Sequence, residues 1–226
     1  MTTAGWQHGV LRDVRTALAV LAHPDDESFG LGAVLDLLTA AGGGVAVLCF
    51  THGEASTLRA DSGDLATTRE AEFTEAARVL GLTATRLLGY PDGGLSAIPL
   101  YELAVQVREM ALDVGASHLV AFDIGGVSGH PDHARATGAA LAAASPLGLA
   151  VLGWTLPETV AGELNAEFGT AFTGRKTGEI SLTLEVDRAR QRRAIACHRS
   201  QSASNPVLWR RLELLGDCEH LRVLRA

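Results

Sequence analysis

The sequence predicts an α/β fold: a Rossmann-like, mainly parallel sheet flanked by helices, with a functional site at the C-terminal ends of its strands. Short apolar runs alternate with longer segments whose apolar residues recur at helical spacing, which is typical of strands joined by crossover helices. A polar cluster follows each of the first four apolar runs. The chain has 226 residues, 47% of them hydrophobic, which suffices for one sizeable core. We therefore expect a single domain over residues 1–226.

The expected elements follow in chain order. Four strands are predicted at residues 16–22, 45–51, 86–88 and 118–122. Four helices are predicted at residues 29–41, 66–80, 100–114 and 131–144. Glycine follows the first three helices, where C-terminal caps occur, at Gly42, Gly81 and Gly115. Later in the chain we expect an apolar strand at 151–154, a hairpin at 168–186 and a helix after Asp187.

Composition limits the classes of partner. The formal net charge is -7 and Lys176 is the only lysine, which argues against a nucleic-acid or anionic membrane surface. The apolar run at 17–22 is too short for a signal core, and no long uncharged stretch exists. Three cysteines without C-x-x-C spacing indicate a reduced setting. We expect a cytoplasmic protein with a small-molecule partner, no nucleic acid and no membrane; homo-oligomerisation is left open.

The polar clusters stand where parallel sheets bind ligands, beyond the carboxyl ends of strands. They are HPDDE at 23–27, THGE at 51–54, YPDGG at 90–94 and FDIGGVSGHPDH at 122–133. This edge of the predicted sheet is thus rich in histidine and carboxylate side chains, so we expect the active site there.

Two of these clusters together suit a metal ion. Catalytic zinc sites take three ligands from histidine and carboxylate and leave one position for water. His23 and Asp26, with His130 or His133, make up such a set. The acidic run alone would also suit a helix N-terminus, but that interpretation does not account for the histidines. The sequence therefore predicts bound Zn²⁺, with Fe²⁺ or another divalent metal as the alternative.

The motifs AHPDDE and GHPDH resemble those of the zinc-dependent N-acetylglucosamine deacetylases of the PIG-L/LmbE type. The similarity continues in order through TxGE at 51–54, RxxE at 69–72, PDG at 91–93 and HxSQ at 198–201. The resemblance implies a Rossmann-like sheet and zinc held by His23, Asp26 and His133. It also implies a general base at Asp25 and an auxiliary acid or oxyanion-stabilising group at His130.

Four further residues have expected roles. Asp132 either orients one of the imidazoles, as part of the catalytic set, or is a first-turn helix acid. Arg69 is expected near the substrate sugar, as the resemblance implies, although most arginines after polar loops are simply solvated. Asp92 either reaches sugar hydroxyls or forms an ordinary turn. His198 is taken as a substrate-binding residue, with support of the C-terminal region as its alternative.

The predicted function is hydrolysis of an N-acetylglucosamine-type conjugate, in which metal-activated water releases the acetyl group and Asp25 takes the proton. Because an ordinary carboxylate is a weak base, we expect burial to raise the pKa of Asp25. One alternative is a hydrolase of another small ester or phosphoester, although the predicted rim offers few cations. The other is a non-catalytic sugar-binding protein with a structural metal, although such metals normally have four protein ligands.

Overall fold

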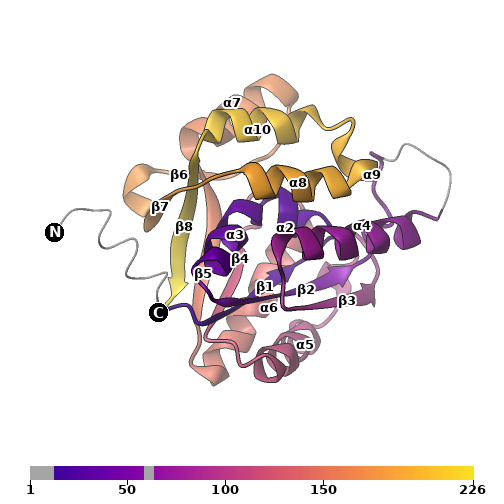
Figure 1. Cartoon of the computed structure of the whole chain (residues 1–226), viewed down its shortest axis with the longest axis vertical. Helices are drawn as coiled ribbons and strands as arrows, with labels where there is room; N and C mark the ends of the chain where they lie inside the picture. The colour runs from indigo at the N-terminus through magenta and orange to yellow at the C-terminus, as the bar shows by residue number, and fades with distance from the viewer. Residues whose placement is uncertain (1–12, 59–63) are drawn as a thin grey trace.

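The computed structural model describes residues 13–58 and 64–226. A mixed sheet lies between helices on its two faces (Figure 1). Its strands are β1 (Thr16–Leu21), β2 (Gly44–Thr51), β3 (Ala84–Tyr90), β4 (His118–Phe122), β5 (Ala150–Pro157), β6 (Gly174–Arg175), β7 (Leu182–Glu185) and β8 (Cys218–Arg225). Strands β1 to β5 pair in parallel, whereas β8 is antiparallel to both β5 and β7.

The helices of the described residues cover both faces of this sheet. They are α2 (Asp26–Phe29), α3 (Gly32–Ala40), α4 (Leu65–Leu80), α5 (Leu100–Asp113), α6 (Pro131–Leu147), α7 (Glu158–Phe168), α8 (Ala189–Cys197), α9 (Arg199–Ser202) and α10 (Pro206–Leu215). Two short 3-10 helices are η1 (Leu95–Ala97) and η2 (Thr177–Glu179). Helices α5 and α6 lie on the opposite side of the sheet from α3, α4 and α8 in Figure 1. None of the helices described is long and apolar enough to cross a membrane.

Strand β1 shows why two core layers form. Successive side chains of a strand point to opposite faces, so an uninterrupted apolar run supplies both layers. Ala19 and Leu21 join one buried cluster with residues of α3, and Leu18 and Val20 join a second cluster with residues of α5 and α6. Burial on both faces explains why this run lacks the polar alternation of a half-exposed strand.

The strand order explains why two distant motifs meet. The order is β3-β2-β1-β4-β5-β8-β7, with β6 paired to β5. From β1 the chain proceeds to β2 and β3 on one side, and then crosses to β4 and β5 on the other. The crevice at such a switch point lies beyond the carboxyl ends of the two central strands. The HPDDE cluster follows β1 and the GHPDH cluster follows β4, so both open into this crevice.

The predicted α/β class with its mainly parallel sheet is confirmed, and the strand at 118–122 has the predicted bounds. Residues 29–41, expected as one helix, are interrupted at Gly30 and Leu31: Phe29 is the last residue of α2, and α3 begins at Gly32.

The hairpin expected at 168–186 is wrong. Strand β6 pairs in parallel with β5, and β7 pairs with β8, so β6 and β7 are not partners. Strand β8 lies between β5 and β7 and supplies antiparallel hydrogen bonds to both, which a local turn between β6 and β7 would not provide. The sequence interpretation also did not predict α7, α10 and β8, whose apolar residues are spaced among many charged ones.

Candidate active site

A cavity of about 420 Å³ opens where β1 and β4 end. It is lined by His23, Asp25, Asp26, Phe29, Gly30, Ala55, Ser56, Thr57, Leu58, Arg69, Asp92, Gly93, Phe122, Ser128, His130, His133, Trp154, Phe172, Gln201 and Arg211. The lining therefore combines residues of the two histidine-containing clusters with aromatic residues from β4, β5 and the segment before β6.

His23, Asp26 and His133 converge on one point of this cavity. His23 Nδ1 lies 3.1 Å from His133 Nε2. Asp26 Oδ1 lies 3.2 Å from the same His133 nitrogen, and Asp26 Oδ2 lies 3.9 Å from His23 Nδ1. Ligands about 2.1 Å from a tetrahedral zinc are separated by about 3.4 Å. The distances from His133 Nε2 to His23 Nδ1 and to Asp26 Oδ1 are close to this value, and one ligand atom of each of the three residues lies within 4.8 Å of the others, so the set suits one shared ion.

Hydrogen bonds hold two of these donors in the orientation that a metal needs. Asp26 Oδ2 accepts hydrogen bonds from the backbone N–H groups of Ala22 and His23, at 3.2 and 3.0 Å, which leaves Oδ1 facing His133. The Ser128 hydroxyl lies 2.5 Å from His133 Nδ1. A proton on that nitrogen, donated to Ser128, leaves the lone pair of Nε2 free for a metal.

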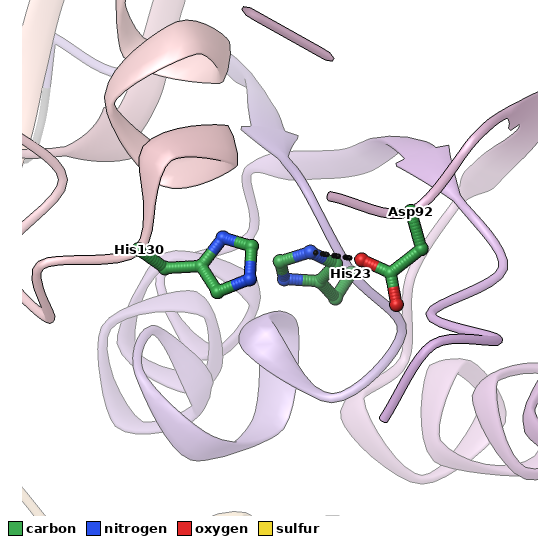
Figure 2. Close-up of side chains that lie close together, drawn as sticks. All are labelled: His23, Asp92 and His130. Atoms are coloured by element: carbon green, nitrogen blue, oxygen red, sulfur yellow. Dashed lines mark ion pairs between the residues drawn. The ribbon is translucent and has the colours of Figure 1, made fainter. Parts of the chain in front are cut away.

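Carboxylates on the other side of His23 complete this arrangement. Asp92 Oδ1 lies 2.9 Å from His23 Nε2, an ion pair that Figure 2 shows, and Asp132 Oδ2 lies 3.7 Å from the same nitrogen. His23, Asp92 and His130 also bring ligand atoms within 4.8 Å of one another. However, a proton on His23 Nε2, which faces the two carboxylates, leaves the lone pair of His23 Nδ1 free for a metal. Because Nδ1 faces His133 and Asp26, the set with these two residues fits a metal better.

The charges of the site fit a cation. Burial alone would lower the pKa of His23, but Asp132, Asp92 and Asp26 outweigh burial and raise it from 6.5 to about 10. Burial alone would raise the pKa of Asp26, but His133 and His23 hold it well below its usual value. The neighbouring carboxylates therefore keep the His23 ring protonated at neutral pH, and a divalent ion can replace the added proton.

Asp25 stands beside the ligand set in an uncommon backbone conformation. Its φ is 127°, which is strained for a residue with a side chain and costs on the order of 1–3 kcal/mol. The Glu27 carboxylate accepts a hydrogen bond from the Asp25 N–H at 2.9 Å and so helps to hold this conformation. Asp25 Oδ2 lies 3.0 Å from Arg69 Nη2. Burial raises the pKa of Asp25 to about 6, although the positive charge of Arg69 acts in the opposite direction. The pKa of Asp25 is thus raised, as expected from the sequence.

Glu27 and His198 form a buried pair behind Asp25. His198 is fully buried and its Nε2 lies 2.6 Å from Glu27 Oε1, to which the Ser28 hydroxyl also donates at 2.6 Å. His198 does not line the cavity, so its placement contradicts the expected contact with substrate and fits the alternative, structural support. The reason is burial: His198 stands between α8 and α9 and packs under the HPDDE turn, where its side chain contacts Glu27.

Arg69 lines the cavity but is 3% exposed. Its guanidinium donates to the carbonyl oxygens of Gly53, at 2.7 Å, and of Pro24, in addition to its ion pair with Asp25. Gly53 has φ +66°, and a Cβ there would lie 2.1 Å from Arg69 Nη1, so the glycine of the TxGE motif makes room for the arginine. Arg69 thus joins the loops after β1 and β2 at the base of the cavity.

His130 and Asp132 begin α6 and have different environments. His130 is the N-cap, and its Nδ1 accepts a hydrogen bond from the Asp132 N–H at 3.2 Å, so Nε2 carries the proton of the neutral ring. Burial, with the charges of His23 and His133, lowers the pKa of His130. Asp132 is fully buried, does not line the cavity, and accepts backbone hydrogen bonds from Gly93 and Leu95 at 2.8 and 3.1 Å. It is therefore placed to position His23 and the loop after β3, not to contact substrate.

The sequence did not predict one wall of the cavity, nor the residue that contacts His133, a proposed metal ligand. The missed wall consists of aromatic residues and an arginine: Phe29, Phe122, Trp154, Phe172 and Arg211. Phe122 and Trp154 are the last residues of predicted strands, and this position could have placed them at the site. No sequence feature places Arg211 there. The missed contact is Ser128, in the same loop as the histidines. Beside it, Gly126 has φ +78° and a Cβ there would lie 2.5 Å from the Ala134 nitrogen, which shows how closely this loop approaches α6.

Comparison with known proteins identifies the family. Residues 18–145 match the model of the family PIG-L, described as GlcNAc-PI de-N-acetylase. This match covers more than half of the chain and includes both histidine motifs, so the chain belongs to the PIG-L family.

The relatives and solved structures agree with this assignment. A 1D-myo-inositol 2-acetamido-2-deoxy-alpha-D-glucopyranoside deacetylase of Kineococcus radiotolerans is 33% identical over 181 residues, 65% of this chain and 50% of the relative. The chain thus spans about half the length of the curated relatives it matches. The conserved protein TT1542 from Thermus thermophilus is 22% identical, with a TM-score of 0.69 over 94% of this chain and 95% of that chain. The N,N'-diacetylchitobiose deacetylase from Pyrococcus horikoshii is also 22% identical, with a TM-score of 0.68 over 98% and 91%. At these identities, the solved structures support the fold.

Proposed function

We propose that the protein is a metal-dependent N-deacetylase that hydrolyses the acetamide of an N-acetylglucosamine conjugate. The single observation that carries this proposal is the convergence of His23, Asp26 and His133 beside Asp25, a half-buried carboxylate that lies outside the ligand set. Membership of the PIG-L family and the names of the relatives support the reaction and the class of substrate.

Zinc is the metal we propose, held by His23 Nδ1, an Asp26 oxygen and His133 Nε2. Two imidazoles and one carboxylate with an open position suit zinc, and the same set also accepts iron or manganese. The ion would supply a Lewis acid that polarises the amide carbonyl and acidifies water.

Asp25 is the proposed general base. Its carboxylate borders the cavity, and a pKa raised to about 6 by burial makes it a stronger base than an exposed aspartate while it remains ionised at neutral pH. Water attacks the carbonyl carbon as Asp25 takes its proton, and the carbon–nitrogen bond breaks as that proton passes to the leaving nitrogen. The products are acetate and the free amine.

Arg69 and Glu27 position this base. Arg69 holds one carboxylate oxygen at 3.0 Å and Glu27 binds the Asp25 N–H, so the side chain is restrained from both ends. This restraint reduces the reorganisation needed when the proton moves.

His130 is the proposed partner of the developing oxyanion. With Nδ1 occupied by the Asp132 N–H, the proton of the neutral ring is on Nε2, which can donate a hydrogen bond within the cavity. Its lowered pKa keeps this ring neutral at pH 7, so its role here is hydrogen-bond donation.

The sugar is proposed to bind between Asp92 and the aromatic residues opposite it. Asp92 Oδ1 is engaged with His23 and Oδ2 accepts a hydrogen bond from Ala55 at 2.9 Å, while the side chain still borders the cavity. Sugar hydroxyls can approach this carboxylate, and Phe122, Trp154 and Phe172 offer apolar surface to the face of the ring.

Acetate release tests the proposal. The full chain, loaded with zinc or treated with a chelator, is incubated with N-acetylglucosamine conjugates, and acetate and free amine are measured together. Release that requires the metal and is lost in Asp25→Asn supports deacetylation. Equal release without metal, or in Asp25→Asn, contradicts the mechanism. Release from esters or phosphoesters alone would favour the other hydrolases, and binding without release would favour a non-catalytic sugar-binding protein.

A further inference from the structure

Arg211 borders the cavity in an unusual state. This α10 residue is 8% exposed, and its guanidinium carbon lies 5.2 Å above the ring centroid of Trp154. Its Nη2 donates to the carbonyl oxygen of Phe29 at 2.7 Å. Its Nε is buried and has no hydrogen-bond partner among the residues described. A guanidinium has five N–H donors, so most of its hydrogen-bonding capacity is not used by the described part of the chain.

Other buried arginines of the described chain have carboxylate partners, and Arg211 does not. Arg69 lies 3.0 Å from Asp25, and Arg188 lies 2.5 Å from Glu219. Within the described residues no carboxylate oxygen lies within ion-pair distance of Arg211. Burial lowers the pKa of Arg211 to about 10, so the side chain is still charged at neutral pH. A buried charge without an anion is unfavourable unless a ligand supplies one.

Packed aromatic rings connect Arg211 with the proposed metal site. Phe122 packs against His133 with ring centroids 4.8 Å apart, and Trp154 packs against Phe122 at 4.9 Å. Arg211 then stacks on Trp154. These contacts form a continuous series of packed side chains from a proposed metal ligand to Arg211, and all four residues border the cavity. A conjugate whose acetamide faces the metal site would extend through the cavity towards the guanidinium.

We propose that Arg211 forms an anion-binding subsite for a carboxylate or phosphate on the conjugate attached to the N-acetylated sugar. This inference rests on the proposed deacetylase function and specifies its substrate class. The planar fork of arginine suits bidentate binding of these oxyanions, and the stacking on Trp154 holds the fork in place. The inositol glycoside in the name of the Kineococcus radiotolerans relative is uncharged, so the subsite would distinguish the substrate of this chain from that one.

The test uses three N-acetylglucosaminides that share one linker: one ends in a carboxylate, one in the primary amide of that carboxylate, and one in a phosphate. The zinc-loaded full chain is compared with Arg211→Gln and Arg211→Lys. The control is Arg210→Gln, which removes the neighbouring guanidinium from α10, where Arg210 pairs with Glu167 and Glu213 on the surface.

We expect the wild type to favour the better of the two anionic probes over the amide by about 10- to 100-fold in kcat/KM. Arg211→Gln should lose this preference, so that its kcat/KM is similar for the anionic probes and the amide, Arg211→Lys should keep part of it, and Arg210→Gln should keep all of it. The carboxylate and phosphate arms show which oxyanion is bound. If the wild type shows no preference for an anionic probe over the amide, the proposal is overturned, even where a variant does not fold. An equal loss of kcat/KM for all three probes in Arg211→Gln also overturns it.

Binding of the corresponding amines separates this inference from the proposed function, because these compounds have no acetyl group to lose. If acetate is not released but the wild type binds the anionic amines more tightly and Arg211→Gln does not, the deacetylase proposal fails and the subsite stands. Equal affinity for all three amines overturns the subsite, whatever the outcome of the activity assay.

Discussion

The two walls of the cavity are held in place in different ways. The polar wall consists of His23, Asp25, Asp26, Arg69 and Asp92, and its side chains contact one another and the backbone of the loops after β1 and β2. The aromatic wall consists of Phe29, Phe122, Trp154, Phe172 and Arg211, and it is held mainly by ring packing.

This difference is clearest for the two arginines that border the cavity. Arg69 pairs with Asp25 and donates to two carbonyl oxygens, whereas Arg211 donates one hydrogen bond, to the carbonyl oxygen of Phe29, and has no carboxylate partner among the described residues. The side chains of the polar wall are therefore held in place by contacts within the protein, whereas Arg211 on the aromatic wall has hydrogen-bond donors left for a ligand.

The largest expected effect is on metal binding by the polar wall. His133→Ala removes one of three proposed ligands, so we expect loss of stoichiometric zinc and of acetate release. Metal content after dialysis and the zinc-dependent rise in melting temperature measure this loss. His118→Ala is the control, because His118 stands at the amino end of the same strand β4 and does not line the cavity. Full zinc content in His133→Ala would show that the ligand set is misassigned.

Asp25→Asn should lower kcat by about 10²- to 10⁴-fold while zinc content is retained, because it removes the base and keeps the shape of the side chain. Single-substrate kinetics with parallel metal analysis measure both quantities. Asp113→Asn is a matched control, since Asp113 pairs with Arg86 on the surface at 2.8 Å. Normal turnover in Asp25→Asn would assign the base to another group.

Ser128→Ala should weaken metal binding by about 10- to 100-fold, because His133 loses the partner that sets its tautomer and ring orientation. Competition with a chromogenic chelator gives the dissociation constant. Ser181→Ala, outside the cavity, is the control. An unchanged dissociation constant would mean that packing against Phe122 suffices to orient the ring.

On the aromatic wall, Trp154→Phe should affect stability and leave metal affinity unchanged. Trp154 Nε1 donates to Glu219 Oε2 at 2.7 Å, and loss of this buried hydrogen bond should cost about 1–3 kcal/mol in the free energy of unfolding. Urea denaturation measures it, with Trp209→Phe on the partly exposed face of α10 as the control. A parallel loss of metal affinity would show that the two walls are not independent.

The last expected effect is a dependence of metal affinity on pH, which needs no substitution in either wall. The pKa of His23 is raised to about 10 without metal, so its ring is protonated at pH 7 and must lose that proton to bind a metal. Metal affinity should therefore rise with pH, by about tenfold per unit between about pH 6 and 8. Calorimetry in buffers of different ionisation enthalpy counts the released proton. Affinity independent of pH would exclude this exchange.

The polar wall could largely be predicted from sequence, because its residues other than Arg69, which lies on α4, belong to compact motifs directly after apolar strands. The motifs after β1 and β4 were expected to meet at the sheet edge, and the structure brings His23 and His133 within 3.1 Å across 110 positions. The roles of Arg69 and Asp92 remain predictions, with contacts that the spacing did not indicate. The placement of His198 away from the cavity could not be predicted, because nothing in HxSQ indicates which side of the HPDDE turn the motif packs against.

The sequence by itself determined the alternation of strands and helices, the edge of the sheet at which the candidate site lies, and the types of side chain gathered there. These properties depend on local periodicity and on motifs of a few residues. Only the tertiary structure decided that His198 is buried against Glu27, that Ser128 orients His133 and that Arg211 reaches the cavity. Arg211 contacts Phe29 from 182 positions away, and such pairs depend on how α8 to α10 pack on the sheet, which no local pattern specifies.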